Sequence, residues 1–248
     1  MNPTAQRIEF LDFARGLALV AMTIFHFAFD LELFGFQEPG FITQPHWKYF
    51  ARVIATSFLI VTGISLYLAH QNGVSWPNWR KRMAMITGAA LAITVATYFA
   101  TPDQYIFFGI LHQIAFASVA GLLFLKLPWL ITMVIGIGVF WVGQSIHLAL
   151  FDPQWLWWTG LSLVTPNSSD FVPVFPWFSA PLIGIAIAKL ASSKGWLGLL
   201  AQPKFESKAG RLLKFFGRNS LVYYLLHQPI MVALILAYAF ATGQLNLG

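Results

Sequence analysis

Apolar windows of about 20 residues recur along the chain, and they constrain its fold more than any other feature. A helix of about 20 apolar residues can cross a hydrocarbon core roughly 30 Å thick. Such windows lie at roughly 13–34, 48–69, 82–100, 105–126, 128–146, 172–191 and 215–241. We therefore predict an all-α, polytopic membrane bundle of about seven transmembrane helices, forming a single integral-membrane domain over residues 1–248.

The composition supports this prediction. Of the 248 residues, 58% are hydrophobic and only 10% are charged, whereas a soluble domain has about 25% charged residues. The sequence has no linker-like stretch and no internal repeat. It also has no cysteine, which excludes disulfides, thiolate metal sites and a cysteine nucleophile.

The distribution of Lys and Arg predicts the orientation. With the N-terminus in the cytoplasm, 13 basic residues lie inside and only Lys48 and Arg52 lie outside, as the positive-inside rule requires. The C-terminus, after Leu245, is then outside. The net charge of +6 follows from this asymmetry, so we expect contact with membrane lipids and no nucleic acid. The first window contains ionisable residues and is too long for the apolar region of a cleavable signal.

One face of the first window carries polar groups into the membrane. At about 100° per residue, the following residues form a narrow stripe: Asp12, Arg15, Leu19, Met22, His26 and Asp30. His26 lies about 16 Å above Arg15, near the bilayer midplane. Ionisable groups at this depth usually face a protein interior and mark a pathway or a reaction centre. A carboxylate four residues away, Asp30, can orient the imidazole and raise its basicity.

Two more histidines are predicted at depth. His227 lies about 14 Å above Arg218, and His112 lies roughly 10 Å below the outer surface. We therefore expect His26, Asp30 and His227 to line one cavity. The alternative for each of the three histidines is that it only forms a hydrogen bond across a helix interface. A metal site is a further alternative, although no compact ligand motif such as H-E-x-x-H occurs.

The last window contains a proline beside polar residues. Pro229 cannot donate to the carbonyl of Leu225, so we expect a kink or a local opening there. Freed backbone beside His227 and Gln228 suits a cavity in the protein interior. Ser220, Tyr223 and His227 share one face of this helix. A kink that only improves packing is the alternative.

Two other clusters remain open to two interpretations. The stretch from Lys189 to Arg218 holds seven basic residues and one acid, Glu206. It can bind the phosphates of a nucleotide-bearing cosubstrate, but topology or anionic lipid explains it equally well. Several tryptophans between residues 155 and 177 accompany Asp152 and Asp170. They fit stacking on a sugar or an interfacial aromatic belt.

Four pieces of the sequence resemble one family in the same order. Leu11-Asp12-Phe13-Ala14-Arg15-Gly16-Leu17-Ala18, followed by Met22 and His26, resembles the opening helix of the heparan-α-glucosaminide N-acetyltransferase-like transmembrane acyltransferases. The later pieces are Arg52 to Gly63, Phe108-Gly109-Ile110-Leu111-His112-Gln113, and Gly217-Arg218-Asn219-Ser220 through His227-Gln228. Phe175-Pro176-Trp177 is similar to bacterial members, which implies a bacterial inner membrane.

This resemblance implies an enzyme that moves an acyl group, most simply acetyl, from cytoplasmic acyl-CoA to an acceptor at the opposite membrane face. A sugar amine or hydroxyl, or another polar group, would serve as acceptor. In the animal branch the reactive histidine precedes the second span, which points to His46. We rank His26 above His46 because Asp30 supports it. The chain is shorter than larger members, which fits a minimal catalytic core or a homodimer.

The resemblance and the residue pattern together give a set of site residues, and we expect no metal cofactor because no compact ligand motif occurs. The catalytic candidates are His26, Asp30, His46 and His227. The candidates for binding acyl-CoA are Asp12, Arg15, Arg52, His112, Gln113, Arg218 and Asn219. Among these, Gln113 and Asn219, together with Tyr223, are candidates to stabilise the developing oxyanion. Two other classes stay open: a small proton-coupled transporter, and a membrane protein that uses the fold without catalysis.

Overall fold

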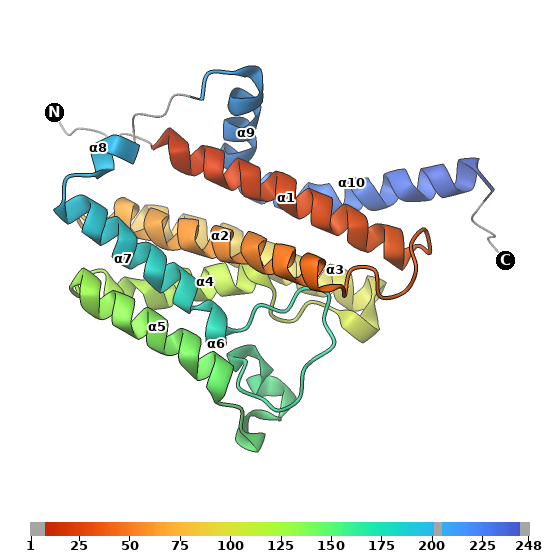
Figure 1. The fold of residues 1–248 in the computed structure, drawn as a ribbon, viewed down its shortest axis with the longest axis horizontal. Coiled ribbons are helices and arrows are strands. Elements are labelled where there is room, and N and C mark those ends of the chain that lie inside the picture. Colours follow the sequence, from red (N-terminus) through yellow and green to blue (C-terminus); the bar gives the residue numbers. More distant parts are fainter. Residues whose placement is uncertain (1–7, 201–204, 244–248) are drawn as a thin grey trace. The chain divides into compact units, whose positions relative to one another are not determined.

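The computed structural model describes residues 8–200 and 205–243, and the regular structure within them is helical, with no strand. Arg7, Lys204 and the C-terminal stretch after Gly243, which enter the orientation argument, lie outside the described residues. The helices are α1 (Glu9–Leu33), α2 (Pro45–His70), α3 (Trp76–Ala100), α4 (Ile110–Ala120), α5 (Trp129–Ser145), α6 (Val174–Trp177), α7 (Ser179–Ser193), α8 (Leu197–Leu200), α9 (Lys208–Arg218) and α10 (Ser220–Ala241). Figure 1 traces them in chain order.

Five helical segments in the described part are long and apolar enough to cross a membrane, which makes the chain an integral membrane protein. They are Glu9–Leu33, Pro45–His70, Trp76–Ala100, Val174–Ser193 (α6 with α7) and Ser220–Ala241. The other two windows hold shorter apolar helices, Ile110–Phe124 and Trp129–Ser145. At 1.5 Å per residue these reach about 22 and 26 Å, less than the roughly 30 Å of the hydrocarbon core.

The backbone explains why these two helices are shorter than their windows. Tyr105 and Gly109 have extended backbone angles, so α4 begins only at Ile110. A side chain at Gly109 would collide with the carboxylate of Asp170, which accepts a hydrogen bond of 2.8 Å from the Ile110 amide. Pro128, with a ψ of 145°, separates the end of the preceding 3-10 turn from α5.

The chain divides into two compact units, and the division falls inside α2. Within the described residues, unit 1 comprises residues 56–200, and unit 2 comprises residues 8–55 and 205–243. Each unit is described by itself below.

Unit 1 is built on tight contacts around α7. Its core consists of Leu66, Ala117, Val174, Phe178, Leu182 and Ile185. A Cβ at Gly63 of α2 would collide with the carbonyl of Pro181, so only glycine permits this approach of α2 to α7. The helix α5 also packs along α7 (Figure 1).

A buried lysine closes one end of this core. The ammonium of Lys189 on α7 donates to the carbonyls of Phe124 and Leu127, the latter at 2.6 Å, and to the Thr132 hydroxyl at 3.3 Å. These carbonyls lie in the connection between α4 and α5, where helix ends leave acceptors without a partner. Lys189 therefore stabilises this connection.

Unit 2 joins α1 to α9 and α10. A Cβ at Gly16 of α1 would collide with the carbonyl of Leu213, and one at Gly217 would collide with that of Asp12, so the backbones of α1 and α9 touch. The helix α9 ends where the Asn219 amide side chain donates to the Phe215 carbonyl at 2.9 Å. The last apolar helix therefore starts at Ser220, later than the window at 215, and it continues through Pro229 to Ala241 without interruption.

Candidate active site

The polar stripe predicted on α1 is the buried face of that helix. Asp12, Leu19, Met22 and Asp30 are buried, and Arg15 and His26 are partly buried. Apolar residues between them, such as Leu17 and Ile24, are about half exposed. Because α1 packs against α9 and α10 within unit 2, the stripe meets protein, as its polarity requires.

His26 and His227 lie side by side where α1 meets α10. Their ring centroids are 5.1 Å apart, and the ring planes are inclined at 62°. Nδ1 of His227 lies 2.6 Å from the Tyr224 carbonyl. A carbonyl only accepts, so Nδ1 carries the proton and Nε2 of the neutral ring is an acceptor. This Nε2 atom is buried and has no hydrogen-bond partner among the described residues.

Asp30 lies in the same contact but binds a different residue. Its Oδ1 accepts a hydrogen bond of 2.6 Å from Nε2 of Gln228 on α10. The expected hydrogen bond between Asp30 and His26 is absent from the described structure. Oδ2 of Asp30 and Oε1 of Gln228 are buried without a hydrogen-bond partner among the described residues. We call His26, Asp30, His227 and Gln228 the central cluster.

Tyr223, one turn before His227, is also tied to α1. Its hydroxyl lies 2.9 Å from Oγ1 of Thr23. The Thr23 hydroxyl donates its own hydrogen bond to the Leu19 carbonyl, at 3.0 Å. Tyr223 is therefore the donor in its hydrogen bond with Thr23. The hydroxyl of Tyr223 must leave Thr23 before it can donate to an oxyanion.

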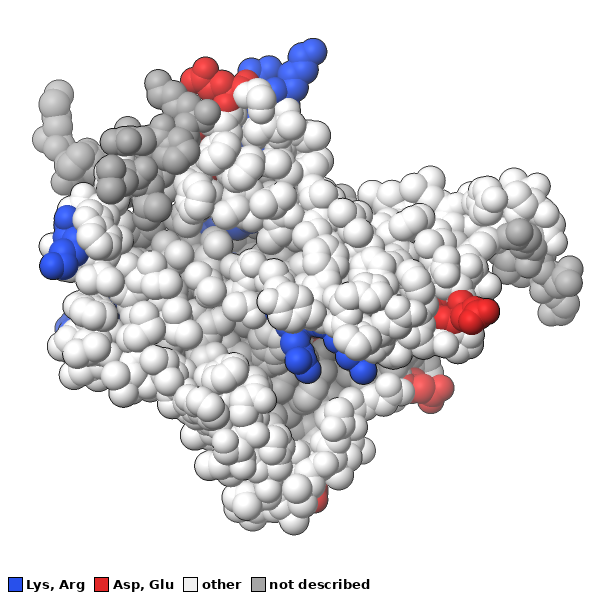
Figure 2. All heavy atoms as spheres, viewed as in Figure 1, with Lys and Arg blue, Asp and Glu red and all other residues white. Residues whose placement is uncertain are grey.

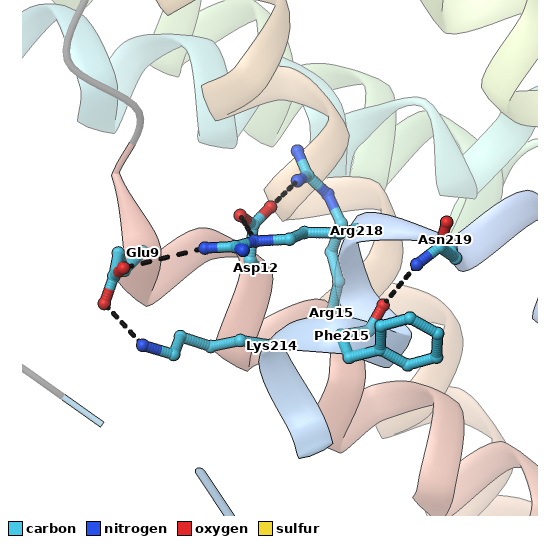
Figure 3. Close-up of polar contacts among 7 residues, drawn as sticks. All are labelled: Glu9, Asp12, Arg15, Lys214, Phe215, Arg218 and Asn219. Atoms are coloured by element: carbon cyan, nitrogen blue, oxygen red, sulfur yellow. Dashed lines mark hydrogen bonds and ion pairs between the residues drawn. The ribbon is translucent and has the colours of Figure 1, made fainter. Parts of the chain in front are cut away.

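Five charged residues at the N-terminal end of α1 form a network that we call the charge lock (Figure 3). Lys214 contacts Glu9 at 2.6 Å. Asp12 lies 3.2 Å from Arg15 and 3.4 Å from Arg218, which also lies 3.6 Å from Glu9. Asp12 is buried, so its charge depends on these cations. The charge lock therefore fastens α9 to α1.

These contacts change the interpretation of the basic stretch. Lys189 donates hydrogen bonds to backbone carbonyls in unit 1. In unit 2, Lys214 and Arg218 form ion pairs with acidic side chains. Arg211 donates to the Glu206 carbonyl at 2.6 Å. Much of the stretch is thus engaged in intramolecular contacts. Charged groups in the view of Figure 2 are confined to a few small patches on a mostly uncharged surface.

His46 and Arg52 both lie in the first part of α2, and both are exposed. The His46 ring contacts only a neighbouring ring in the described structure, that of Trp47, at 5.6 Å between centroids. His46 therefore lacks the buried surroundings that the structure gives His26.

His112, in unit 1, has both ring nitrogens engaged. The Gly109 amide donates to Nδ1 at 3.2 Å, so Nε2 carries the proton and donates to Oγ1 of Thr94, also at 3.2 Å. The Thr94 hydroxyl in turn donates to the Ile106 carbonyl at 2.7 Å. This chain of hydrogen bonds fixes the start of α4 and matches the structural alternative for His112.

Gln113, the next residue, is different. It is fully buried, and neither Nε2 nor Oε1 has a hydrogen-bond partner among the described residues. A buried amide in this state usually has a water or a ligand as its partner. Gln113 thus remains a candidate binding residue of unit 1.

The aromatic loop of unit 1 uses its acids for its own structure. Oδ1 of Asp152 accepts from the Ser162 hydroxyl and the Leu163 amide, both at 2.8 Å. The indole of Trp157 donates to the Asp152 carbonyl, while Trp155 is largely exposed. Within residues 8–200 and 205–243, no three His, Asp or Glu side chains are grouped to hold a metal ion.

These features define a class: a polytopic helical membrane protein with two histidines in contact and a buried carboxylate at one helix contact. The chain matches the family described as heparan-alpha-glucosaminide N-acetyltransferase, catalytic, over residues 7–229. It therefore belongs to this family of membrane acetyltransferases, as its motifs predicted. The match covers parts of both units. Comparisons with curated proteins and with solved structures found no match.

Sequence reasoning missed the roles of three residues in unit 2. Gln228 donates a hydrogen bond to Asp30, and Thr23 accepts one from Tyr223. The Tyr224 carbonyl fixes the tautomer of His227. The first two pairs join positions about 200 residues apart, so only the packing of α1 on α10 reveals them. The third follows the local i, i+3 spacing of a helix, but a backbone acceptor leaves no mark in the sequence.

Proposed function

We propose that the protein transfers an acyl group, the acetyl of the family's reaction, from acyl-CoA on the cytoplasmic side to a polar acceptor at the opposite membrane face. The acceptor is a sugar amine or hydroxyl, or a similar group. Family membership supports the chemistry. The single observation that carries the choice of site is the His26–His227 contact of 5.1 Å, beside an unpartnered His227 Nε2.

In this proposal His26 receives the acyl group or deprotonates the acceptor, and His227 assists it. Either step needs a neutral imidazole that presents a bare nitrogen. Burial in an apolar helix contact favours the neutral ring. His46 is retained as the second candidate, since the family pattern points to a histidine before the second span.

For acyl-CoA we propose contacts at the cytoplasmic end of unit 2. Arg218 is 44% exposed and uses Nε and Nη2 for carboxylates, which leaves further N–H groups for a phosphate. Asp12 and Arg15 then place Arg218 as well as closing the helix contact. We keep Arg52, Asn219, His112 and Gln113 as further candidates, with Gln113 favoured by its unpartnered amide.

We also propose the finer topology. Seven spans with a cytoplasmic N-terminus and an outside C-terminus follow from the apolar windows and the 13-to-2 charge split. The location would be a bacterial inner membrane, the whole chain would act as one catalytic domain, and a homodimer would explain the small size. A reporter fused after Gly248 that is active only in the cytoplasm would overturn this topology.

The test is transfer by purified protein in nanodiscs made from the host membrane's lipids. We expect thiol release from acetyl-CoA and isotopic label in a lipid or glycan fraction, with loss of that product in a deletion strain. Binding of acyl-CoA without thiol release supports the non-catalytic alternative. Absence of both binding and release favours the transporter.

A further inference from the structure

The unpartnered atoms of the central cluster share one property, which is that all of them accept hydrogen bonds. Asp30 Oδ2 belongs to a carboxylate whose other oxygen already accepts from Gln228. Gln228 Oε1 is an amide oxygen, and His227 Nε2 is bare because Nδ1 donates to Tyr224. All three are buried without a donor among the described residues. The cluster therefore presents three acceptor atoms that no described donor satisfies.

Asp30 and His26 do not form a joint pair in this arrangement. A carboxylate that only orients a histidine accepts from its ring N–H. Here Asp30 accepts instead from Gln228 at 2.6 Å, and the side chain of Asp30 is completely buried. Its second oxygen remains available to take a proton from another molecule.

The geometry points to Asp30 as the proton acceptor for the attacking group of the acyl acceptor, with Gln228 as its positioning residue. This inference rests on the proposed acyl transfer, and it assigns the deprotonation of the acceptor to Asp30 rather than to His26. As the acceptor's nitrogen or oxygen bonds to the acyl carbon, its N–H or O–H bond breaks and the proton moves to Asp30 Oδ2. The carbon–sulfur or carbon–imidazole bond breaks, and the electron pair stays on the leaving group. That group, thiolate or imidazolate, takes up the proton that Asp30 received, which returns Asp30 to its carboxylate form.

The other ionisable groups near Asp30 on these two helices are Glu32 and the two histidines. Glu32, two residues on, accepts from the Gly40 and Ile42 amides at 2.8 Å each. His26 and His227 face each other. Glu32 thus offers a matched control, a carboxylate on the same helix whose two oxygens are both engaged.

The decisive variant is Asp30→Asn, assayed for acyl transfer in nanodiscs. An Asn side chain still bonds to Gln228, so the helix contact persists while the proton acceptor is lost. We expect kcat to fall about 10²- to 10³-fold with little change in KM for acyl-CoA. Glu32→Gln should keep the wild-type kcat.

Two further variants separate chemistry from structure. In Asp30→Ala, added formate should restore transfer at least about tenfold, because it supplies the missing carboxylate, and it should leave the wild type unchanged. Gln228→Met should lower kcat in the wild-type background and have no further effect in Asp30→Asn, because Gln228 acts through Asp30.

The outcomes distinguish this inference from the proposed function. If the wild type is active and Asp30→Asn is equally active, the role of Asp30 is overturned and the proposed function stands. A folded Asp30→Ala variant that formate does not restore overturns the role of Asp30 as well. A wild-type protein that releases no thiol and labels no acceptor overturns the proposed function, and the role of Asp30 with it.

Discussion

The charge lock and the central cluster lie in the same unit and both involve α1, yet they differ in whether their polar groups have partners. In the charge lock each charged side chain has an opposite charge within 3.6 Å. In the central cluster three buried polar atoms have no partner in the described structure. Buried polar atoms without partners cost stability. Their retention in one place marks that place for binding or chemistry, whereas the paired charges fasten helices.

The largest expected effect tests the central cluster. His26→Ala should reduce acyl transfer about 10³-fold or more. It should leave the thermal midpoint in detergent nearly unchanged, because His26 makes no hydrogen bond across the helix contact in the described part of the chain. Thiol release from acetyl-CoA and a thermal scan measure the two quantities.

His46→Ala is its control, since this exposed ring should be dispensable. A dead His46→Ala variant with full turnover by His26→Ala would assign the reaction to His46. Full turnover by both would remove histidine from the mechanism.

The next effect belongs to the charge lock. Asp12→Asn removes the buried charge that faces Arg15 and Arg218, and we expect a loss of about 2 kcal/mol in unfolding free energy. This loss of unfolding free energy is smaller than for a fully buried ion pair, because the guanidinium groups of Arg15 and Arg218 retain access to solvent. Denaturation followed by tryptophan fluorescence would measure it. A stable Asp12→Asn protein would show that the glycine contacts and the Glu9 ion pairs hold α9 without the charge of Asp12.

A smaller loss of unfolding free energy is expected at the Thr23–Tyr223 hydrogen bond, which lies between the charge lock and the central cluster along α1. Thr23→Val removes the acceptor for the Tyr223 hydroxyl and should cost about 1 kcal/mol. Tyr223→Phe should cost a similar amount, and the double variant should cost little more than either single one. Fully additive losses would mean that the two hydroxyls do not act as a pair.

The smallest effect is expected at the rim of the charge lock. Glu9 is 39% exposed, and exposed ion pairs contribute little because water screens them. Glu9→Gln should therefore leave the thermal midpoint within the error of replicate scans. A clear fall would place Glu9, rather than Asp12, at the centre of the charge lock.

The sequence was sufficient for the helical membrane fold and for the buried face of α1, because both depend on periodicity. It also placed His26 and His227 close together, since depth can be counted from a charged end at a fixed rise per residue. Helix length was harder to predict. The windows at 105–126 and 128–146 remain apolar where the backbone leaves the helix, so Gly109 and Pro128 set the ends instead.

Partner choice was the least predictable part of the candidate site. Asp30 and His26 have the i, i+4 spacing that predicts a pair, but Gln228 takes the carboxylate because α10 presents its amide there. A helix-to-helix contact depends on register and rotation, which local spacing does not encode. The same reason explains Lys189, which donates to backbone carbonyls, although its basic stretch had left a phosphate contact open as one interpretation.

The buried Lys189 has a consequence for biogenesis. Its ammonium satisfies the carbonyls of Phe124 and Leu127, which precede it by more than 60 residues. During synthesis α4 and α5 emerge before α7, so these acceptors have no cation until the ribosome has passed residue 189. We expect chains arrested before that point to be recognised by membrane quality-control proteases, and Lys189→Met to prolong the protease-sensitive stage of assembly.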